Sequence, residues 1–395
     1  MSVIKVNKIE STGTTAGGVE VDSSGHVTVD GVQMPSAGAL SNRNLVINGG
    51  MTVSQRGTSS SFAHDGTTTG YSLDRMSFVT ANLESLDCTI TQSTDAPAGF
   101  SKSLKFTTGT PEAAINANDI VYIQTLIEAQ NLQHLQYGTS SAQTLTLSFY
   151  VKSSVTGTYG CSFFQDDGSR NRTATYTINT ANTWERKEIT LTGDTGGTIN
   201  NDNGVGFQVA WNLATGSDWD STDSTAWGAY VSSRWGYGHA QDGVITTAGA
   251  TWQITGVQLE VGEKATTFEH RSHGDELARC QRYYYRHTDG SVLNTHPVMS
   301  GMWYATTSVY GVVHFPTEMR AAPTLQVSTN GNAAAFRCWK PSAYGTSSTV
   351  GVQNVGKTCG ALYFSAISSA GVAGHGAWVE INSDSGVHVS FSAEM

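Results

Sequence analysis

The sequence predicts a mainly β protein: an antiparallel jelly-roll sandwich, then one short helix, then a second, C-terminal β-sandwich module. Three observations predict this. Short segments of alternating apolar and polar residues recur along the chain, separated by turn residues. Charged residues are 14% of the 395, below the roughly 25% of average soluble proteins, and turn- and strand-forming polar residues take their place. One convincing helix signal stands alone, at residues 275–282.

Residues 1–42 differ from the rest of the chain. They contain very short β-prone runs, at Val19–Val21 and Val27–Val29, separated by Gly and Ser. So little apolar surface cannot close a core alone. We therefore expect an attachment or intertwining segment that orders against a partner chain, with an unstructured terminus as the alternative.

The first large module is expected at residues 43–270. Its clearest strand signal is at 144–152, where Leu, Phe and Val alternate with Thr, Ser, Tyr and Lys. Residues 44–53 also hold one apolar phase, which indicates a strand, and 127–136 can form one helical turn. The other expected strands are 158–164, 173–178, 186–192, 206–211 and 252–261.

Residues 251–286 form a seam between the two modules. The strand pattern of 252–261 shifts phase by one residue at Gly256, which predicts a β-bulge. Ser272 is expected to cap the following helix through Asp275. We therefore assign residues 271–286 to a linker helix and its flanks.

The second module is expected at residues 287–395. Its last strand signal is a clear alternation of Val387, Val389 and Phe391. The expected strands are 303–315, 324–328, 361–366, 377–381 and 386–391.

Bulk properties exclude several classes of protein. The net charge of −10 comes without a basic tract, which argues against a nucleic-acid partner. No apolar run approaches the ~20 residues of a membrane-spanning helix, and no apolar region follows the N-terminus as in a secretory signal. The five Cys are odd in number and far apart, which favours small buried residues over a disulfide framework or a zinc site.

Several blocks resemble those of bacteriophage tail-fibre and receptor-binding proteins. The blocks span about residues 44–286, more than half of the chain, and their order and number make the resemblance fairly specific. They are NLVING at 44–49, QRG at 55–57, YSLDR at 71–75, LSFYVKS at 147–153 and ITGVQLEVGEKATTFEHRS at 254–272, which leads into ELARCQRYYYR. FPTEMRAAPT at 315–324 is also similar to such fibres.

This resemblance implies a jelly roll similar to carbohydrate-binding modules, carried on a homotrimeric fibre that contacts host surface polysaccharide. Residues 1–42 would join other virion tail proteins, and the chain would be assembled in the host cytoplasm and end in the virion tail fibre. Leu277 and the Tyr283–Tyr285 run are expected to pack against symmetry mates. The shared blocks contain no catalytic residue, so we expect no enzyme activity and no cofactor.

The aromatic-rich stretch 211–237 is the candidate sugar-binding region. Sugars stack their C–H faces on aromatic rings, while their hydroxyls need polar partners such as the nearby Asp residues. Trp211 shares the phase of its strand and is expected in the core, whereas the other Trp rings can stack on sugar, fill the core or contact another subunit. The candidate residues are Trp219, Trp227, Tyr230, Arg234 and Trp235.

Metal and catalytic chemistry receive little support. Asn48 and Glu260 occupy places where similar jelly rolls hold calcium, but two residues without a ligand loop do not predict a metal. Asp166-Asp167 and the Asp residues of 218–223 are carboxylates that a glycosidase needs, yet Asp before Gly or Ser usually marks a turn. Two alternatives to a glycan-recognising fibre remain: a connector or capsid-decorating fibre without a receptor, and a tail-associated polysaccharide depolymerase.

Overall fold

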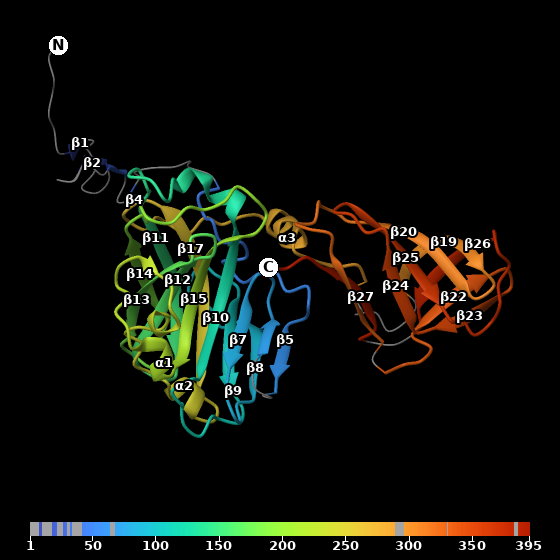
Figure 1. Cartoon of the computed structure of the whole chain (residues 1–395), viewed down its shortest axis with the longest axis horizontal. Helices are drawn as coiled ribbons and strands as arrows, with labels where there is room; N and C mark the ends of the chain where they lie inside the picture. The colour runs from blue at the N-terminus through green and yellow to red at the C-terminus, as the bar shows by residue number, and fades with distance from the viewer. Residues whose placement is uncertain are drawn as a thin grey trace, which may run out of the picture. The chain divides into compact units, whose positions relative to one another are not determined.

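The computed structural model describes residues 8–9, 18–21, 27–29, 32–33, 42–63, 68–288, 296–329, 331–382 and 386–395. The chain forms two compact units, Met1–Arg271 and Ser272–Met395 (Figure 1). Both are built mainly from β-strands that pair in antiparallel fashion. The expected fold class, β-sandwich modules with little helix, is confirmed.

Four short strands precede the first sandwich. They are β1 (Lys8–Ile9), β2 (Val19–Val21), β3 (Val27–Val29) and β4 (Val32–Gln33), and they form one antiparallel sheet. The two β-prone runs noted in the sequence are β2 and β3. Most of the expected attachment segment, residues 1–42, lies outside the described residues.

The sandwich of the first unit consists of a seven-stranded and a six-stranded sheet. The order of the seven-stranded sheet is β16-β13-β12-β15-β10-β7-β6, and that of the six-stranded sheet is β14-β11-β17-β9-β8-β5. Their bounds are β5 (Ser59–Phe62), β6 (Thr68–Tyr71), β7 (Ser77–Ala81), β8 (Cys88–Ser93), β9 (Ser103–Thr108), β10 (Ile120–Glu128), β11 (Leu145–Ser153), β12 (Gly157–Gln165), β13 (Arg170–Ile178), β14 (Glu185–Leu191), β15 (Val205–Thr215), β16 (Gly228–Ala229) and β17 (Thr251–Val261).

The core lies between the two sheets, and alternation along the central strands fills it. Trp211 of β15 is completely buried there, as expected. On β17 the buried apolar residues change phase between Ile254 and Val257, and the pairing with β11 shifts register at the same place. Gly256 stands between them with φ of +62°, so the predicted β-bulge is confirmed.

Residues 44–53 do not form a strand, contrary to the expectation. Asn48 and Met51 have φ of 60° and 56°, in the left-handed region, which lies outside the range of regular strand residues. The Asn48 side chain stabilises this turn, since its Nδ2 donates to the Val53 carbonyl at 2.8 Å and its Oδ1 accepts from the Val53 N–H at 2.9 Å. The segment runs close beside β17, where a Cβ on Gly49 would stand 2.1 Å from the carbonyl oxygen of Val257.

Short helical turns interrupt the β structure of the first unit. The expected turn within 127–136 is the 3₁₀ helix η1 (Ala129–Leu135). Three further turns were not expected: α1 (Ser217–Asp220), η2 (Ser232–Arg234) and α2 (Gly243–Thr246). They lie in and after the Trp-rich stretch, where their four residues or fewer are too short to show a helical period.

The second unit begins with α3 (His273–Gln281), which is followed by β18 (Tyr284–Arg286). Ser272 Oγ accepts from the Asp275 N–H at 3.1 Å, so the predicted cap is confirmed. Tyr283 and Tyr284 are only 1% and 2% exposed within this unit. The expectation that they pack against symmetry mates is therefore wrong.

A three-stranded sheet, β18-β27-β21, and a seven-stranded sheet, β23-β22-β26-β19-β20-β25-β24, enclose the core of the second unit. The stretch 303–315 is not one strand, because the chain turns back at 306–307 without a Gly, Pro, Asn or Asp to mark the turn. The strand bounds are β19 (Pro297–Ala305), β20 (Ser308–His314), β21 (Thr324–Ser328), β22 (Phe336–Lys340), β23 (Ala343–Ser347), β24 (Thr349–Gln353), β25 (Cys359–Ser365), β26 (Gly376–Ile381) and β27 (His388–Ser392).

None of the five cysteines, all of which lie in the described residues, forms a disulfide, and four are buried, as the sequence predicted for most of them. Burial raises the pKa of the Cys88 and Cys338 thiols to about 12. Only Cys359 is partly exposed. Four of the thiols thus behave as small apolar side chains.

Candidate functional site

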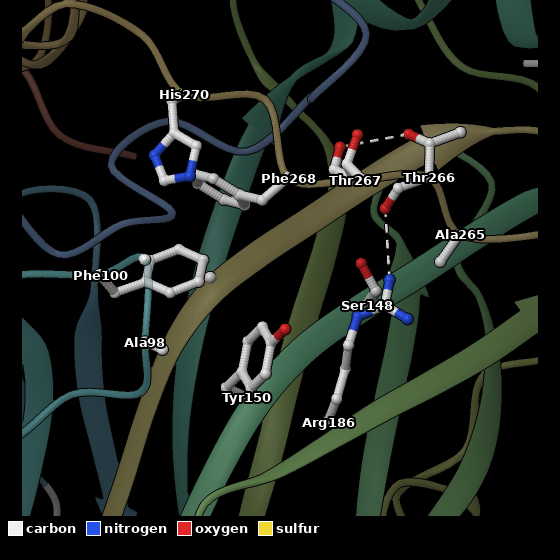
Figure 2. A pocket seen from close by; sticks show the side chains of 12 residues that line it. Ala98, Phe100, Ser148, Tyr150, Arg186, Ala265, Thr266, Thr267, Phe268 and His270 are labelled. Atoms are coloured by element: carbon white, nitrogen blue, oxygen red, sulfur yellow. Dashed lines mark hydrogen bonds between the residues drawn. The ribbon is translucent and has the colours of Figure 1, made fainter. Parts of the chain in front are cut away.

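A pocket of about 570 Å³ lies on the outer face of the six-stranded sheet of the first unit (Figure 2). Ser148 and Tyr150 of β11, Arg186 of β14 and Gly256 of β17 form its floor. Ser148 and Tyr150 point outward because Leu147, Phe149 and Val151, which alternate with them, fill the core. Two loops, at 98–100 and 265–270, supply the walls.

Four aromatic rings form one side of the pocket. The ring centroid of Phe100 lies 5.4 Å from that of Tyr150, 5.0 Å from that of Phe268 and 5.3 Å from that of His270. Phe268 and His270 meet edge to face at 4.9 Å. Figure 2 shows these rings grouped on one side, while the hydroxyl and guanidinium groups lie on the other. The pocket thus combines an apolar side and a polar side.

The bulge on β17 makes room for the rings. A Cβ on Gly256 would stand 2.7 Å from Cζ of Phe100 and 3.0 Å from Cδ2 of Tyr150. The φ of +62° at Gly256 is also one that other residues rarely adopt. Glycine is therefore required here both by the backbone and by the close approach of two pocket rings.

Arg186 carries the charge on the polar side. One guanidinium nitrogen, Nη2, donates to the carbonyl oxygen of Thr266 at 3.2 Å, and Nη1 pairs with Glu188. The side chain is 35% exposed, so it can also meet a ligand. The exposed Thr267 continues this polar side, beside Thr266, whose N–H and hydroxyl group are turned to Glu260.

Glu260 fixes the loop that carries the Thr residues. Its carboxylate is 1% exposed and accepts hydrogen bonds from Thr266 N–H at 2.8 Å, Thr266 Oγ1 at 2.7 Å and Gln258 Nε2 at 2.8 Å. Arg43 Nε lies 3.6 Å from it. This residue, considered above beside Asn48 as a calcium ligand, thus holds the pocket rim in place.

Glu269 and Arg271 hold the other end of the same loop. Burial alone would raise the pKa of Glu269, but the Asn44 N–H and the Arg271 guanidinium outweigh it, so its pKa is lowered. The Asn44 N–H donates to Glu269 at 3.0 Å, and Arg271 donates to the Val46 carbonyl at 3.1 Å. These contacts tie residues 266–271 to the turn at 44–53, so the block 254–272 builds one continuous pocket wall.

The pocket lining consists mainly of aromatic rings and hydroxyl groups, with the guanidinium of Arg186 and the imidazole of His270. None of the residues that line the pocket is Asp, Glu or Cys. In the described part of the chain, no three His, Cys, Asp or Glu residues gather as metal ligands do. The helices that the structure describes are all too short or too polar to cross a membrane. With its aromatic side and its polar side, the pocket can stack on the apolar face of a ring-shaped ligand and hydrogen-bond to the hydroxyl groups of that ligand.

Three of the five candidate residues from the sequence meet on the opposite sheet of the unit. Trp219, Tyr230 and Trp235 pack together with Tyr122 and Phe164 on the outer face of the seven-stranded sheet. Trp235 is only 5% exposed, so its ring supports the cluster from beneath. Burial, with a contribution from Tyr230, raises the pKa of Tyr122 to about 12.

The other two candidates hold loops in place. Trp227 packs edge to face against Phe207 of the main core, and its Nε1 donates to the Thr192 carbonyl at 2.8 Å. Arg234 donates to the carbonyls of Asp223 and Ala226, at 2.6 and 2.8 Å. None of the five lines the pocket, and sugar contact by them stays a prediction.

The acidic candidates also occupy separate places. Asp223 accepts from Thr225 N–H at 2.8 Å, as turn residues do, whereas Asp167 accepts from the N–H of the distant Asn200 at 2.9 Å. Burial raises the pKa of Asp166 and of Asp220. None of these carboxylates lines the pocket.

Comparison with known proteins gives limited information. No protein-family model matches the chain, and no curated protein matches it. Partial similarity exists to solved structures, among them the enzymatically active domain of a bacteriophage CBA120 tailspike, which has 14% identity and a TM-score of 0.29. That match covers 55% of this chain and 21% of the tailspike domain, so the chain spans about a fifth of that structure.

Two carbohydrate-binding modules are similar over about half of the chain. A family 11 module of a Clostridium thermocellum cellulase has 11% identity and a TM-score of 0.24, over 54% of this chain and 91% of its own. A family 61 module in complex with β-1,4-galactotriose has 10% identity and a TM-score of 0.25, over 56% of this chain and 100% of its own. At these identities and TM-scores, the similarity to solved structures carries no argument about the function of this chain. The geometry of the pocket is the basis for that argument.

Proposed function

We propose that this chain is a structural virion protein of a phage tail fibre, without enzyme activity, that recognises host cell-surface glycans during adsorption. The observation that carries the glycan-binding part is the pocket over the bulge at Gly256. There an aromatic wall centred on Phe100 faces Arg186 and the Thr266–Thr267 rim. A pyranose ring has the same two-sided character, with C–H faces and hydroxyl edges.

The fibre part of the proposal rests on the sequence blocks. The most specific block, 254–272, is the segment that forms the bulge and one wall of the pocket. We include in the proposal a homotrimer, attachment to other tail proteins through residues 1–42, and assembly in the host cytoplasm. Three weak pockets on one trimer would gain strength from multivalency.

The direct test is binding of the full chain to purified host polysaccharide, measured by titration calorimetry. Phe100→Ala should weaken binding at least about tenfold, because the variant loses the ring at the centre of the aromatic wall. Arg186→Ala should weaken it by a similar factor. Tyr71→Ala is the matched control, since it removes a half-buried ring from β6 of the opposite sheet, outside both the pocket and the candidate residues. Unchanged binding by both pocket variants would contradict the proposed site.

Catalysis can be tested on the same samples. The proposal expects no release of reducing ends when the protein is incubated with the polysaccharide. The depolymerase alternative expects release that is lost in Asp220→Asn, because burial raises the pKa of this carboxyl as a general acid requires. The connector alternative expects neither binding nor release.

A further inference from the structure

Exposed apolar side chains gather on one sheet of the second unit. Within the described residues nine large hydrophobic side chains are exposed, and five of them lie on the seven-stranded sheet. They are Met302 (48%), Tyr304 (67%), Val312 (58%), Tyr344 (42%) and Trp378 (44%). A contiguous group of this kind on a soluble domain marks an interaction surface.

Alternation along the strands places these side chains on the face away from the core. Trp303, which follows Met302 on β19, is completely buried, as is Val309, which precedes Tyr310 on β20. Met302 and Tyr310 pair directly across the two strands. We call the outer surface the aromatic face. It comprises Met302, Tyr304, Tyr310, Val312, Trp339, Tyr344, Tyr363 and Trp378.

Neighbouring rings of the aromatic face contact each other, and one of them lies over the sheet. Tyr310 is 4.8 Å from Tyr304 and 5.3 Å from Tyr363 between ring centroids, and the latter pair is stacked at 18°. A Cβ on Gly351 would lie 2.2 Å from Cζ of Tyr363, so that ring covers the glycine. The rings of Tyr304, Tyr310 and Tyr363 thus form a continuous row across β19, β20 and β25.

The charges on the aromatic face compensate each other. Arg337 Nη1 lies 3.6 Å from Glu380 Oε1, and the guanidinium lies 5.0 Å over the ring of Tyr344. Trp378 Nε1 donates to Glu380 Oε2 at 3.4 Å. The face therefore carries no net charge, although the whole chain carries −10.

We propose that the aromatic face binds a second copy of this chain. Trp, Tyr, Met and Arg are the residues enriched at the centre of protein interfaces. Two chains of −10 repel each other, so a neutral face is where copies can meet.

A glycan fits this face less well than a copy does. The exposed aliphatic chains of Met302 and Val312 offer sugars neither stacking nor hydrogen bonds, and the carboxylate of Glu380, which is only 8% exposed, faces Arg337 and Trp378 of its own chain. The inference names a surface for the homotrimer of the proposed function and rests on that part alone. It does not depend on glycan binding in the first unit.

The test is sedimentation of the full chain over about 0.1 to 100 µM, compared with the double variant Tyr304→Ser/Trp378→Ser. Wild type should associate, and the variant should do so at least about 100-fold more weakly, because exposed aromatic residues dominate interface energies. Val231→Ser, which is 49% exposed on the first unit, is the matched control and should behave as wild type. Circular dichroism checks that the variants are folded.

Two outcomes would overturn the inference. One is a wild-type chain that stays monomeric over the whole range. The other is a double variant that associates as wild type does, with or without a loss of glycan binding. Glycan titration of the double variant keeps the two proposals apart, because the pocket predicts that its affinity per chain is unchanged.

Discussion

The pocket of the first unit and the aromatic face of the second are both rich in aromatic rings, yet they differ in shape and in polar groups. The pocket rings stand upright around a bulge, beside a partly exposed guanidinium and Thr hydroxyls. On the aromatic face the Tyr363 ring lies over Gly351, and the charges of Arg337 and Glu380 are paired with each other. Ring content alone therefore does not identify a sugar site; concavity and polar groups within reach separate a small polar ligand from a protein partner.

The largest test of this contrast is Gly256→Ala. The new Cβ would meet the Phe100 and Tyr150 rings in a backbone conformation with φ of +62°, so we expect a loss of about 3 kcal/mol in unfolding free energy and loss of glycan binding. Gly249→Ala is the control, because Gly249 has φ of +74° with open space around it, and should cost only about 1 kcal/mol. Urea denaturation followed by Trp fluorescence measures both. Equal losses would show that ring contact at the bulge contributes nothing.

The next test is Glu260→Gln, which keeps the shape of the pocket rim but removes its buried charge. The Thr266 N–H and Arg43 lose a carboxylate partner, so we expect about 2 kcal/mol of destabilisation and weaker glycan binding. Self-association should not change. A stable variant with full affinity would mean that the rim holds its place without Glu260.

Gly351→Ala makes the corresponding change on the aromatic face. The Cβ would meet only the tip of the Tyr363 side chain, which can tilt away, so folding stability should change by less than about 1 kcal/mol. Tilting of the Tyr363 ring disturbs the packing of rings on the aromatic face, and we expect self-association to weaken about tenfold. Sedimentation gives the result, with glycan affinity as the internal control. Association as strong as in wild type would argue against a flat interface.

The smallest expected effect concerns pH. Partial burial alone would raise the pKa of Glu185. The hydrogen bonds from Lys187 and from the N–H groups of Thr180 and Asn179 outweigh this effect, so the pKa is about 2 in the folded chain. This carboxylate thus adds stability above its unfolded pKa of about 4.3, and the contribution is lost as the pH falls toward 2.

Glu185→Gln should therefore cost about 1 kcal/mol at pH 7 and nothing near pH 2. Paired denaturation curves at the two pH values measure the difference. Because Glu185 precedes Arg186 on β14, the pocket should lose some affinity at low pH while the aromatic face should not. A penalty that is the same at both pH values would point to lost packing instead of lost charge.

Sequence reasoning succeeded where one short segment determines its own geometry. The phase shift at Gly256 predicted the bulge, and Ser272 predicted the helix start, because both signals are local. The strand alternation at 144–152 also gave β11 within one residue. Such signals fix the fold class and the individual elements of the sandwich.

The pocket could not be read from sequence in the same way. Phe100, Arg186 and Phe268 come from three distant segments, and two of them lie in loops without periodicity. Their meeting depends on the order of strands in the sheet, which no local pattern specifies. The dense Trp-rich stretch predicted a sugar site elsewhere, although the side chains of Trp227 and Trp235 mainly pack against other residues of the unit. The one available signal was Gly256, whose phase shift also marks the pocket floor.

The distribution of the cysteines has a practical consequence. Four thiols are buried, whereas Cys359 at the start of β25 is partly exposed and alternates with Gly360 to face the same side as Ala361 and Tyr363. A single fluorescent dye on the unaltered protein should thus attach at the border of the aromatic face. Energy transfer between labelled copies would then report their distance in solution without any engineered residue.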